Sequence, residues 1–76
     1  MEIHLGGHLA FYEREKRSRF SVHLPARTPL LDLVRAFGIP EAEIDLATVN
    51  LTVVALGEAE VEDADRVDLY PPMSGG

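Results

Sequence analysis

The first third of the chain alternates between apolar and polar residues. Over residues 2–10, one side of the pattern holds Ile3, Leu5 and Leu9. The alternation returns after a charged segment, at Phe20, Val22 and Leu24. A period of two residues is typical of half-buried strands, and two such runs with a polar connection predict a hairpin. Gly6 and Gly7 interrupt the first run, where we expect a bulge.

The next segment has the spacing of a short amphipathic helix. Thr28 is expected to be its N-cap and Pro29 its first helical residue. Gly38 is expected to end it, with Pro40 as a stop. The apolar stripe consists of Leu30, Leu33, Val34 and Phe37. Such a helix needs a sheet against which to bury this stripe.

The second half of the chain reads as further strands. Residues 41–45 are acidic and predict an irregular segment or one tight turn. Strands are expected near 46–50 and 52–55 with a turn at Asn50, and residues 57–65 are expected to be a polar connection. A last strand is expected over 66–70, with Val67 and Leu69 on the side opposite Asp68 and Tyr70. Pro71 and Pro72 cannot donate backbone hydrogen bonds, so the chain must leave the sheet there.

This order of elements predicts an α+β fold. Two strands, a helix and three more strands contain no βαβ repeat, so a mixed sheet of about four to five strands packed on one main helix is the economical architecture. With 76 residues there is room for one small core. We expect residues 1–70 to form this domain and residues 71–76 to form an extended, flexible C-terminal tail.

Composition and charge exclude several classes of function. The chain has no cysteine, which excludes disulfides, thiolate metal ligands and a thiol nucleophile. Its net charge of −6 opposes binding to nucleic acid. No apolar run is long enough to cross a membrane and the start lacks the pattern of a signal peptide, so we expect a cytoplasmic protein. The acidic residues crowd the second half of the chain, whereas four of the seven basic residues are Arg14, Lys16, Arg17 and Arg19.

The sequence ends in Pro71-Pro72-Met73-Ser74-Gly75-Gly76. A diglycine tail has no side chains at its tip and can enter a narrow cleft, where a partner enzyme reaches the terminal carboxylate. Together with Gly38-Ile39-Pro40, Thr48-Val49-Asn50 and Asp63-Ala64-Asp65-Arg66-Val67, this tail resembles the ubiquitin-like β-grasp sulfur carriers. Within them it looks most like the small subunit of molybdopterin synthase, with the thiamine sulfur carrier a close relative. The resemblance covers essentially the whole chain.

The resemblance implies a carrier that is not itself an enzyme and binds no cofactor or metal. A ubiquitin-activating-type adenylyltransferase would use ATP to adenylate the Gly76 carboxylate, and sulfur from a persulfide donor would displace AMP to leave a thiocarboxylate. The large subunit of molybdopterin synthase, or a thiazole synthase, would then accept the sulfur. Recognition of the tail would fall on Pro71, Pro72, Met73, Ser74 and Gly75. We expect neither nucleic acid nor membrane among the partners.

Two positions depart from the pattern of these carriers. The family often has glycine after the asparagine and between the two aspartates, where this chain has Leu51 and Ala64. The turns at these positions must therefore differ, or carry strain of about 1 kcal/mol each. Some β-grasp domains that share the aspartate-flanked approach are fused to nucleases and act in no sulfur pathway; the diglycine end favours the carriers.

Three other functions stay open beside the molybdopterin carrier. These are a carrier for thiazole synthesis, a ubiquitin-like protein modifier and a binding module with an inert tail. Lys16 is the only lysine, so chain formation through lysine would have to use it alone.

Other candidate chemistry in the sequence has a plainer interpretation. If the hairpin forms over the full predicted length, His4, His8 and His23 project from one face, but their spacing matches no recognised metal-ligand pattern and we interpret them as exposed structural histidines. Ser74 has no evident base and is not expected to be catalytic. Asp63 and Asp65 are interpreted as caps of a turn. Gly6-Gly7 is not a phosphate loop, because no helix is expected after it.

Overall fold

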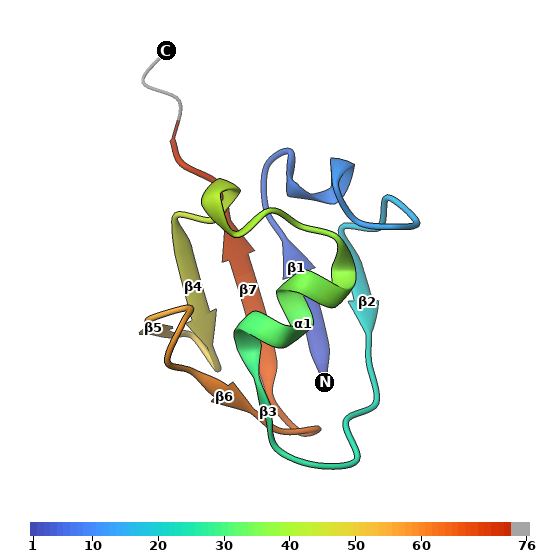
Figure 1. Ribbon diagram of the computed structural model, residues 1–76, viewed down its shortest axis with the longest axis vertical. Coiled ribbons are helices and arrows are strands. Elements are labelled where there is room, and N and C mark those ends of the chain that lie inside the picture. The colour runs from blue at the N-terminus through green and yellow to red at the C-terminus, as the bar shows by residue number, and fades with distance from the viewer. Residues whose placement is uncertain (74–76) are drawn as a thin grey trace.

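The computed structural model of the protein describes residues 1–73. In this part of the chain a five-stranded mixed sheet forms one layer and a single α-helix crosses one of its faces (Figure 1). Within these residues the strands of this sheet lie in the order β2-β1-β7-β4-β5. Their bounds are Arg19–Ser21 for β2, Glu2–Leu5 for β1, Arg66–Tyr70 for β7, Leu46–Val49 for β4 and Thr52–Val54 for β5. The α+β fold with a ubiquitin-like β-grasp architecture is confirmed.

The centre of the sheet joins the two halves of the chain. Strand β1 pairs parallel with β7, with Ile3 opposite Val67, and antiparallel with β2 on its other side. Strand β7 also pairs antiparallel with β4, where Leu46 lies opposite Tyr70. A second sheet of two short strands, β3 (Thr28–Pro29) and β6 (Glu60–Val61), lies near the start of the helix (Figure 1).

The helix α1 spans Leu30–Phe37 and ends as predicted. Gly38 adopts the left-handed conformation with φ of 84°, and its N–H donates to the Arg35 carbonyl. This conformation favours glycine because a Cβ atom would be strained there. Leu30 and Val34 are fully buried and Leu33 and Phe37 are partly buried, so the predicted stripe faces the sheet.

The core consists of thirteen buried hydrophobic residues from both sheets, the helix and the connections. They are Met1, Ile3, Leu5, Leu9, Phe20, Leu24, Leu30, Val34, Ile39, Ala47, Val61, Val67 and Leu69. Two short 3-10 helices, η1 (Leu9–Phe11) and η2 (Glu41–Glu43), complete the fold. The tight turn expected in the acidic segment is η2.

The predicted first strand is too long. Strand β1 ends at Leu5, and η1 follows in place of the expected strand and bulge. The reason is local: Gly7 has φ of +53°, and the Leu9 and Phe11 N–H groups donate to the Gly6 and His8 carbonyls. Likewise β2 ends at Ser21, although the Val22 N–H still donates to the Met1 carbonyl.

The predicted start of the helix is also wrong. Thr28 and Pro29 form β3, and the Thr28 hydroxyl donates to the Ala26 carbonyl instead of capping α1. The first helical residue is Leu30, whose N–H donates to the Ala59 carbonyl. The stretch expected to be only a polar connection therefore contains β6, which pairs with β3.

The two departures from the carrier pattern have different outcomes. Asn50 and Leu51 form the turn between β4 and β5 with φ of 51° and 68°, the backbone of a type I′ turn. Leu51 thus adopts a conformation that favours glycine. Ala64 has no positive φ, so its turn is built differently and requires no glycine.

Candidate functional site

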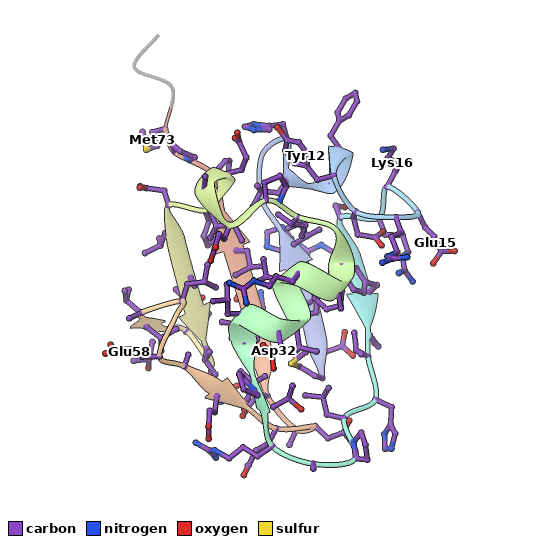
Figure 2. All side chains as sticks on the ribbon, viewed as in Figure 1. Tyr12, Glu15, Lys16, Asp32, Glu58 and Met73 are labelled. Atoms are coloured by element: carbon purple, nitrogen blue, oxygen red, sulfur yellow. The ribbon has the colours of Figure 1, made fainter. Side chains whose placement is uncertain are left out.

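The C-terminal segment leaves the sheet at the end of its central strand. Tyr70 is the last residue of β7, and its carbonyl accepts a hydrogen bond from the Asp45 N–H at 2.9 Å. Pro71 is partly buried, whereas Pro72 is exposed and the Met73 side chain is 94% exposed. The two prolines stop strand pairing as predicted, because neither can donate to a ladder. Figure 2 shows Met73 beyond the edge of the sheet.

Two glycines let this segment pass close to the first strand. The Gly6 N–H donates to the Leu69 carbonyl at 2.7 Å, and a Cβ atom at Gly6 would lie 2.5 Å from the Tyr70 ring. A Cβ atom at Gly7 would lie 2.6 Å from Pro71 Cγ, and the φ of Gly7 is positive. Side chains at these positions would push Tyr70 and Pro71 aside. Gly6 and Gly7 therefore fix the direction in which the C-terminal segment leaves the domain, a role that the sequence alone did not suggest.

A groove lies at the base of this segment, which we call the tail-base groove. It has a volume of about 550 Å³. Its walls come from three places in the chain, and the lining residues are Gly7, His8, Asp45, Leu46, Tyr70, Pro71, Pro72 and Met73. Leu46 is 39% exposed, so an apolar surface continues from Met73 along the groove. The groove is wide enough for side chains of a partner that holds the C-terminal segment.

The loop that follows Gly7 is fixed by a buried carboxylate. The Glu13 residue is 1% exposed, and its Oε1 atom accepts hydrogen bonds from the N–H groups of Glu15 at 3.2 Å and Arg17 at 2.9 Å. The Arg17 guanidinium donates to both carboxylate oxygens, at 3.1 and 3.2 Å. The hydrogen bonds from the Arg17 side chain, helped by the two backbone N–H groups, lower the pKa of Glu13 to about 2. The guanidinium also lies 4.4 Å from the centre of the Phe20 ring, which connects the loop to the core.

A second buried carboxylate lies on the other face of the sheet from the helix. Asp68 is 1% exposed, although the alternation pattern placed it outward. Its Oδ1 atom is 3.1 Å from His4 Nδ1 and 3.3 Å from the Arg66 guanidinium, and the Thr48 hydroxyl lies 3.4 Å from Oδ2. These neighbouring side chains cover Asp68 and satisfy its oxygens. We interpret this cluster as structural, because every buried polar side-chain atom among the described residues has a partner.

The predicted common face of the histidines is wrong. His4 contacts Asp68, while His8 Nε2 lies 3.5 Å from Glu43 and His23 Nδ1 lies 3.4 Å from Asp63. The three rings therefore face carboxylates in separate parts of the domain. The common face is lost because β1 ends at Leu5, before His8, and β2 ends at Ser21, before His23. Within residues 1–73, no group of three His, Asp or Glu side chains is arranged to hold a metal ion.

The interpretation as a turn cap is confirmed for Asp65 and is wrong for Asp63, which joins its turn to the distant segment at Leu24 instead of capping it. Asp65 accepts hydrogen bonds from the Asn50 side-chain amide at 2.9 Å and from the Glu62 N–H at 2.7 Å, and these lower its pKa. Asp63 accepts a hydrogen bond from the Leu24 N–H at 2.8 Å, which is the main cause of its own lowered pKa.

Three residues predicted for the tail lie outside the described part of the chain. They are Ser74, Gly75 and Gly76. Of the other predicted tail residues, Pro71, Pro72 and Met73 lie together along one wall of the tail-base groove. The sequence missed Gly7, His8, Asp45 and Leu46 as groove residues, because they come from segments that only the folded sheet brings together.

The model of the family described as Mut7-C ubiquitin matches residues 4–75, nearly the entire chain. No curated protein matches the sequence. Over the described residues, no helix has the length and apolar character needed to cross a membrane.

Proposed function

The chain belongs to the Mut7-C ubiquitin family, and we propose that it is a sulfur carrier that acts through the carboxyl group of Gly76. The observation that carries the proposal is the way the chain leaves the sheet. The central strand ends in a Pro-Pro pair, the next residue is 94% exposed, and the sequence continues as Ser-Gly-Gly. The proposal requires a free carboxylate on Gly76.

The chemistry follows from the low reactivity of a carboxylate. A Gly76 carboxylate oxygen attacks the α-phosphorus of ATP on a ubiquitin-activating-type adenylyltransferase, the bond from that phosphorus to the bridging oxygen breaks, and pyrophosphate leaves. The terminal sulfur of an enzyme persulfide then attacks the acyl carbon and AMP leaves with its electron pair. A thiol reductant cleaves the resulting acyl disulfide, so the thiol and the donor cysteine become a disulfide and Gly76 becomes a thiocarboxylate.

The residues of this chain supply presentation, not catalysis. Pro71 and Pro72 restrict the backbone to extended conformations, which lowers the entropy lost when the segment enters an enzyme cleft. Gly6 and Gly7 fix where the segment begins. Capture of an extended C-terminal segment through its backbone and carboxylate is a known mode of peptide recognition. In this role the protein is not an enzyme and holds no cofactor of its own.

We further propose that the sulfur is used in molybdopterin synthesis, with the large subunit of molybdopterin synthase as the acceptor. Thiazole synthase is the alternative acceptor, and the resemblance of the tail to both groups of carriers supports either. Transfer from the purified thiocarboxylate to each synthase in turn separates them. Turnover with thiazole synthase alone would overturn the molybdopterin assignment.

The carrier proposal is tested by intact mass spectrometry. The chain is incubated with the adenylyltransferase of the same organism, ATP, a cysteine-persulfide donor and a thiol. The expected result is a mass gain equal to one oxygen-to-sulfur exchange that maps to the C-terminal peptide and is absent when Gly76 is deleted. No gain, together with no ATP–pyrophosphate exchange, would refute the proposal. Conjugates to other proteins through Gly76 would instead identify a protein modifier.

A further inference from the structure

The loop between Gly7 and Arg19 exposes an aromatic side chain that the fold does not use. Phe11 is 75% exposed, although it follows the fully buried Leu9 in the same 3-10 helix η1. An exposed phenylalanine leaves a large apolar surface in contact with water, which is unfavourable. In binding surfaces this free energy is regained when a partner covers the ring. A hollow of about 290 Å³, lined by Ala10, Phe11 and Lys16, lies beside the ring.

Side-chain hydrogen bonds fix the loop that carries Phe11 to itself and to the end of α1. The buried Glu13 carboxylate accepts hydrogen bonds from two of its N–H groups. The Arg14 side chain donates to the Ala36 carbonyl near the end of α1 at 3.0 Å, and the Lys16 ammonium donates to the Phe11 carbonyl. Phe11 is thus presented by a fixed scaffold, which reduces the ordering cost of binding.

The charge of this loop is opposite to that of the rest of the protein. Residues 11–19 contain four basic and two acidic residues in a chain whose net charge is −6. Both acidic residues, Glu13 and Glu15, are paired with Arg17. Among residues 1–73, Arg14 and Lys16 form no ion pair with a carboxylate, and Lys16 Nζ lies 5.6 Å from the centre of the Phe11 ring. The surface formed by Ala10, Phe11, Arg14 and Lys16, which we call the Phe11 surface, is therefore both apolar and cationic.

This surface lies at the same end of the domain as the C-terminal segment. Figure 1 shows η1 and the loop after it at the end of the sheet from which β7 continues. Gly7 contacts Pro71 closely, and His8, the residue before η1, lines the tail-base groove and packs edge to face on Tyr12. Figure 2 shows Tyr12, Lys16 and Met73 at this same end of the molecule. A protein that holds residues 71–73 is thereby placed within reach of the Phe11 surface.

We propose that the Phe11 surface is a second contact with the activating adenylyltransferase, in which Phe11 enters an apolar pocket rimmed by carboxylates on the enzyme. The inference rests on the proposed carrier function. Charge complementarity determines the chemistry of the partner surface. Arg14 and Lys16, which pair with no carboxylate among residues 1–73, attract acidic groups, while the acidic remainder of the domain repels them. A docking contact of this kind is made equally before and during adenylation, so it affects binding and not the chemical step.

The test is ATP–pyrophosphate exchange by the adenylyltransferase of the same organism, with the full chain as the varied substrate. Phe11→Ser is compared with Leu51→Ser, since Leu51 is 76% exposed and lies in the turn after β4, at the opposite end of the sheet from Tyr70. We expect Phe11→Ser to raise KM about tenfold with kcat within about twofold of wild type, and Leu51→Ser to leave both unchanged. Phe11→Trp, which keeps an aromatic ring, is expected to retain most of the affinity.

Charge is tested by a second matched pair. Lys16→Gln and Arg35→Gln each remove one positive charge from an exposed position. We expect Lys16→Gln to raise KM about threefold at low salt, an effect that shrinks as salt screens the attraction, and Arg35→Gln to have no such effect. Thermal melts of all variants within a few degrees of wild type would show that the fold is retained.

The outcomes separate the two proposals. Exchange by wild type with an unchanged KM for Phe11→Ser, or an equal rise for Leu51→Ser, would overturn the Phe11 surface and leave the carrier function standing. No exchange by wild type would refute the carrier function and this inference with it. Binding of a labelled single-stranded RNA that Phe11→Ser abolishes, without any change in KM for exchange, would assign the surface to nucleic acid and also overturn the proposal.

Discussion

Carboxylates fasten the turns at both ends of the sheet, but they do so in different surroundings. At the end where the C-terminal segment leaves, the buried Glu13 accepts hydrogen bonds from two backbone N–H groups and from Arg17. At the opposite end, the partly exposed Asp65 accepts one backbone N–H and the neutral amide of Asn50. A carboxylate thus accepts hydrogen bonds that hold a turn in both places, with a charged partner where it is buried and with a neutral partner where it is partly exposed. We expect the buried Glu13 to stabilise its loop more than Asp65 stabilises its turn. The Glu13 loop exposes Phe11, and a loop with a stable conformation loses less entropy when it binds a partner.

The largest expected effect is the loss of the buried carboxylate. Glu13→Ala leaves the N–H groups of Glu15 and Arg17 without their acceptor, and we expect it to lower the free energy of unfolding by about 3 kcal/mol. Urea denaturation at pH 7 measures this. Glu15→Ala is the control, because the Glu15 side chain is 68% exposed and pairs only with Arg17. If Glu13→Ala lowered the free energy of unfolding by less than Asp65→Ala does, the buried carboxylate would not be the stronger of the two, and the comparison of the two ends of the sheet would be wrong.

The same residue predicts how stability depends on pH. Hydrogen bonds from Arg17 lower the pKa of Glu13 from 4.5 to about 2, so folding favours its ionised form. Its contribution is therefore complete above pH 4.5 and is lost as pH falls through about 2. The difference in unfolding free energy between wild type and Glu13→Ala should narrow over this range. A constant difference would show that the charge of Glu13 is not what holds the loop.

The next largest effect is expected at the contact between the first strand and the C-terminal segment. Gly7→Ala places a methyl group 2.6 Å from Pro71 Cγ at a residue with φ of +53°, so we expect a loss of about 2 kcal/mol. Gly57→Ala is the matched control, since among residues 1–73 no atom outside Gly57 and its two chain neighbours lies within 4 Å of the added methyl group, and the φ of Gly57 is not positive. Chemical-shift changes at Tyr70 and Met73 in the Gly7 variant would show that the segment has moved. Equal costs for the two variants would contradict this account.

A smaller effect is expected at the opposite end of the sheet. Asp65→Ala removes the acceptor of the Glu62 N–H and of the Asn50 amide, and we expect a loss of about 1 kcal/mol, the net contribution of a typical intramolecular hydrogen bond. Thermal unfolding detects a loss of this size in a domain of 76 residues. Glu58→Ala, a substitution of an exposed carboxylate in the same half of the chain, provides the reference. No loss relative to this reference would mean that Asp65 does not fasten the turn.

The smallest effect is a gain. Leu51→Gly relieves a leucine at φ of 68°, and we expect an increase in unfolding free energy of about 0.5 kcal/mol. Ala64→Gly is the contrasting variant, because Ala64 has no positive φ and a glycine there only adds freedom to the unfolded chain. We therefore expect opposite signs for two substitutions that both restore the family's common residue. The same sign for both would refute the assignment of strain to Leu51.

Elements with strong local signals could be predicted from the sequence. The end of α1 follows from Gly38, a glycine that can adopt the left-handed conformation. The full extent of β7 follows from a short alternating run before Pro71-Pro72. Strands β3 and β6 have two residues each, too few for a period, and form only because they pair with one another. Thr28 illustrates the difference, since its suitability as a cap was overridden by this pairing.

The candidate site could be predicted only in part. The segment 71–73 and its exit from the sheet follow from the two prolines. The tail-base groove does not, because its walls come from Gly7, Asp45 and Leu46, which lie far apart in sequence. The burial of Glu13 and Asp68 could not be predicted either. Glu13 is covered by Arg17, and Asp68 by His4 and Arg66, and no hydrophobic pattern in the sequence reveals these partners.

The central position of β7 determines when the domain can fold. Because β7 lies between β1 and β4, neither half of the sheet has its inner neighbour until residues 66–70 are available. Contacts between residues so distant in sequence slow the search for the native state, and a chain emerging from the ribosome has to wait for its last strand. The sheet is therefore completed only when β7 pairs with both of its neighbours, and the segment after Tyr70 follows that strand directly in the sequence.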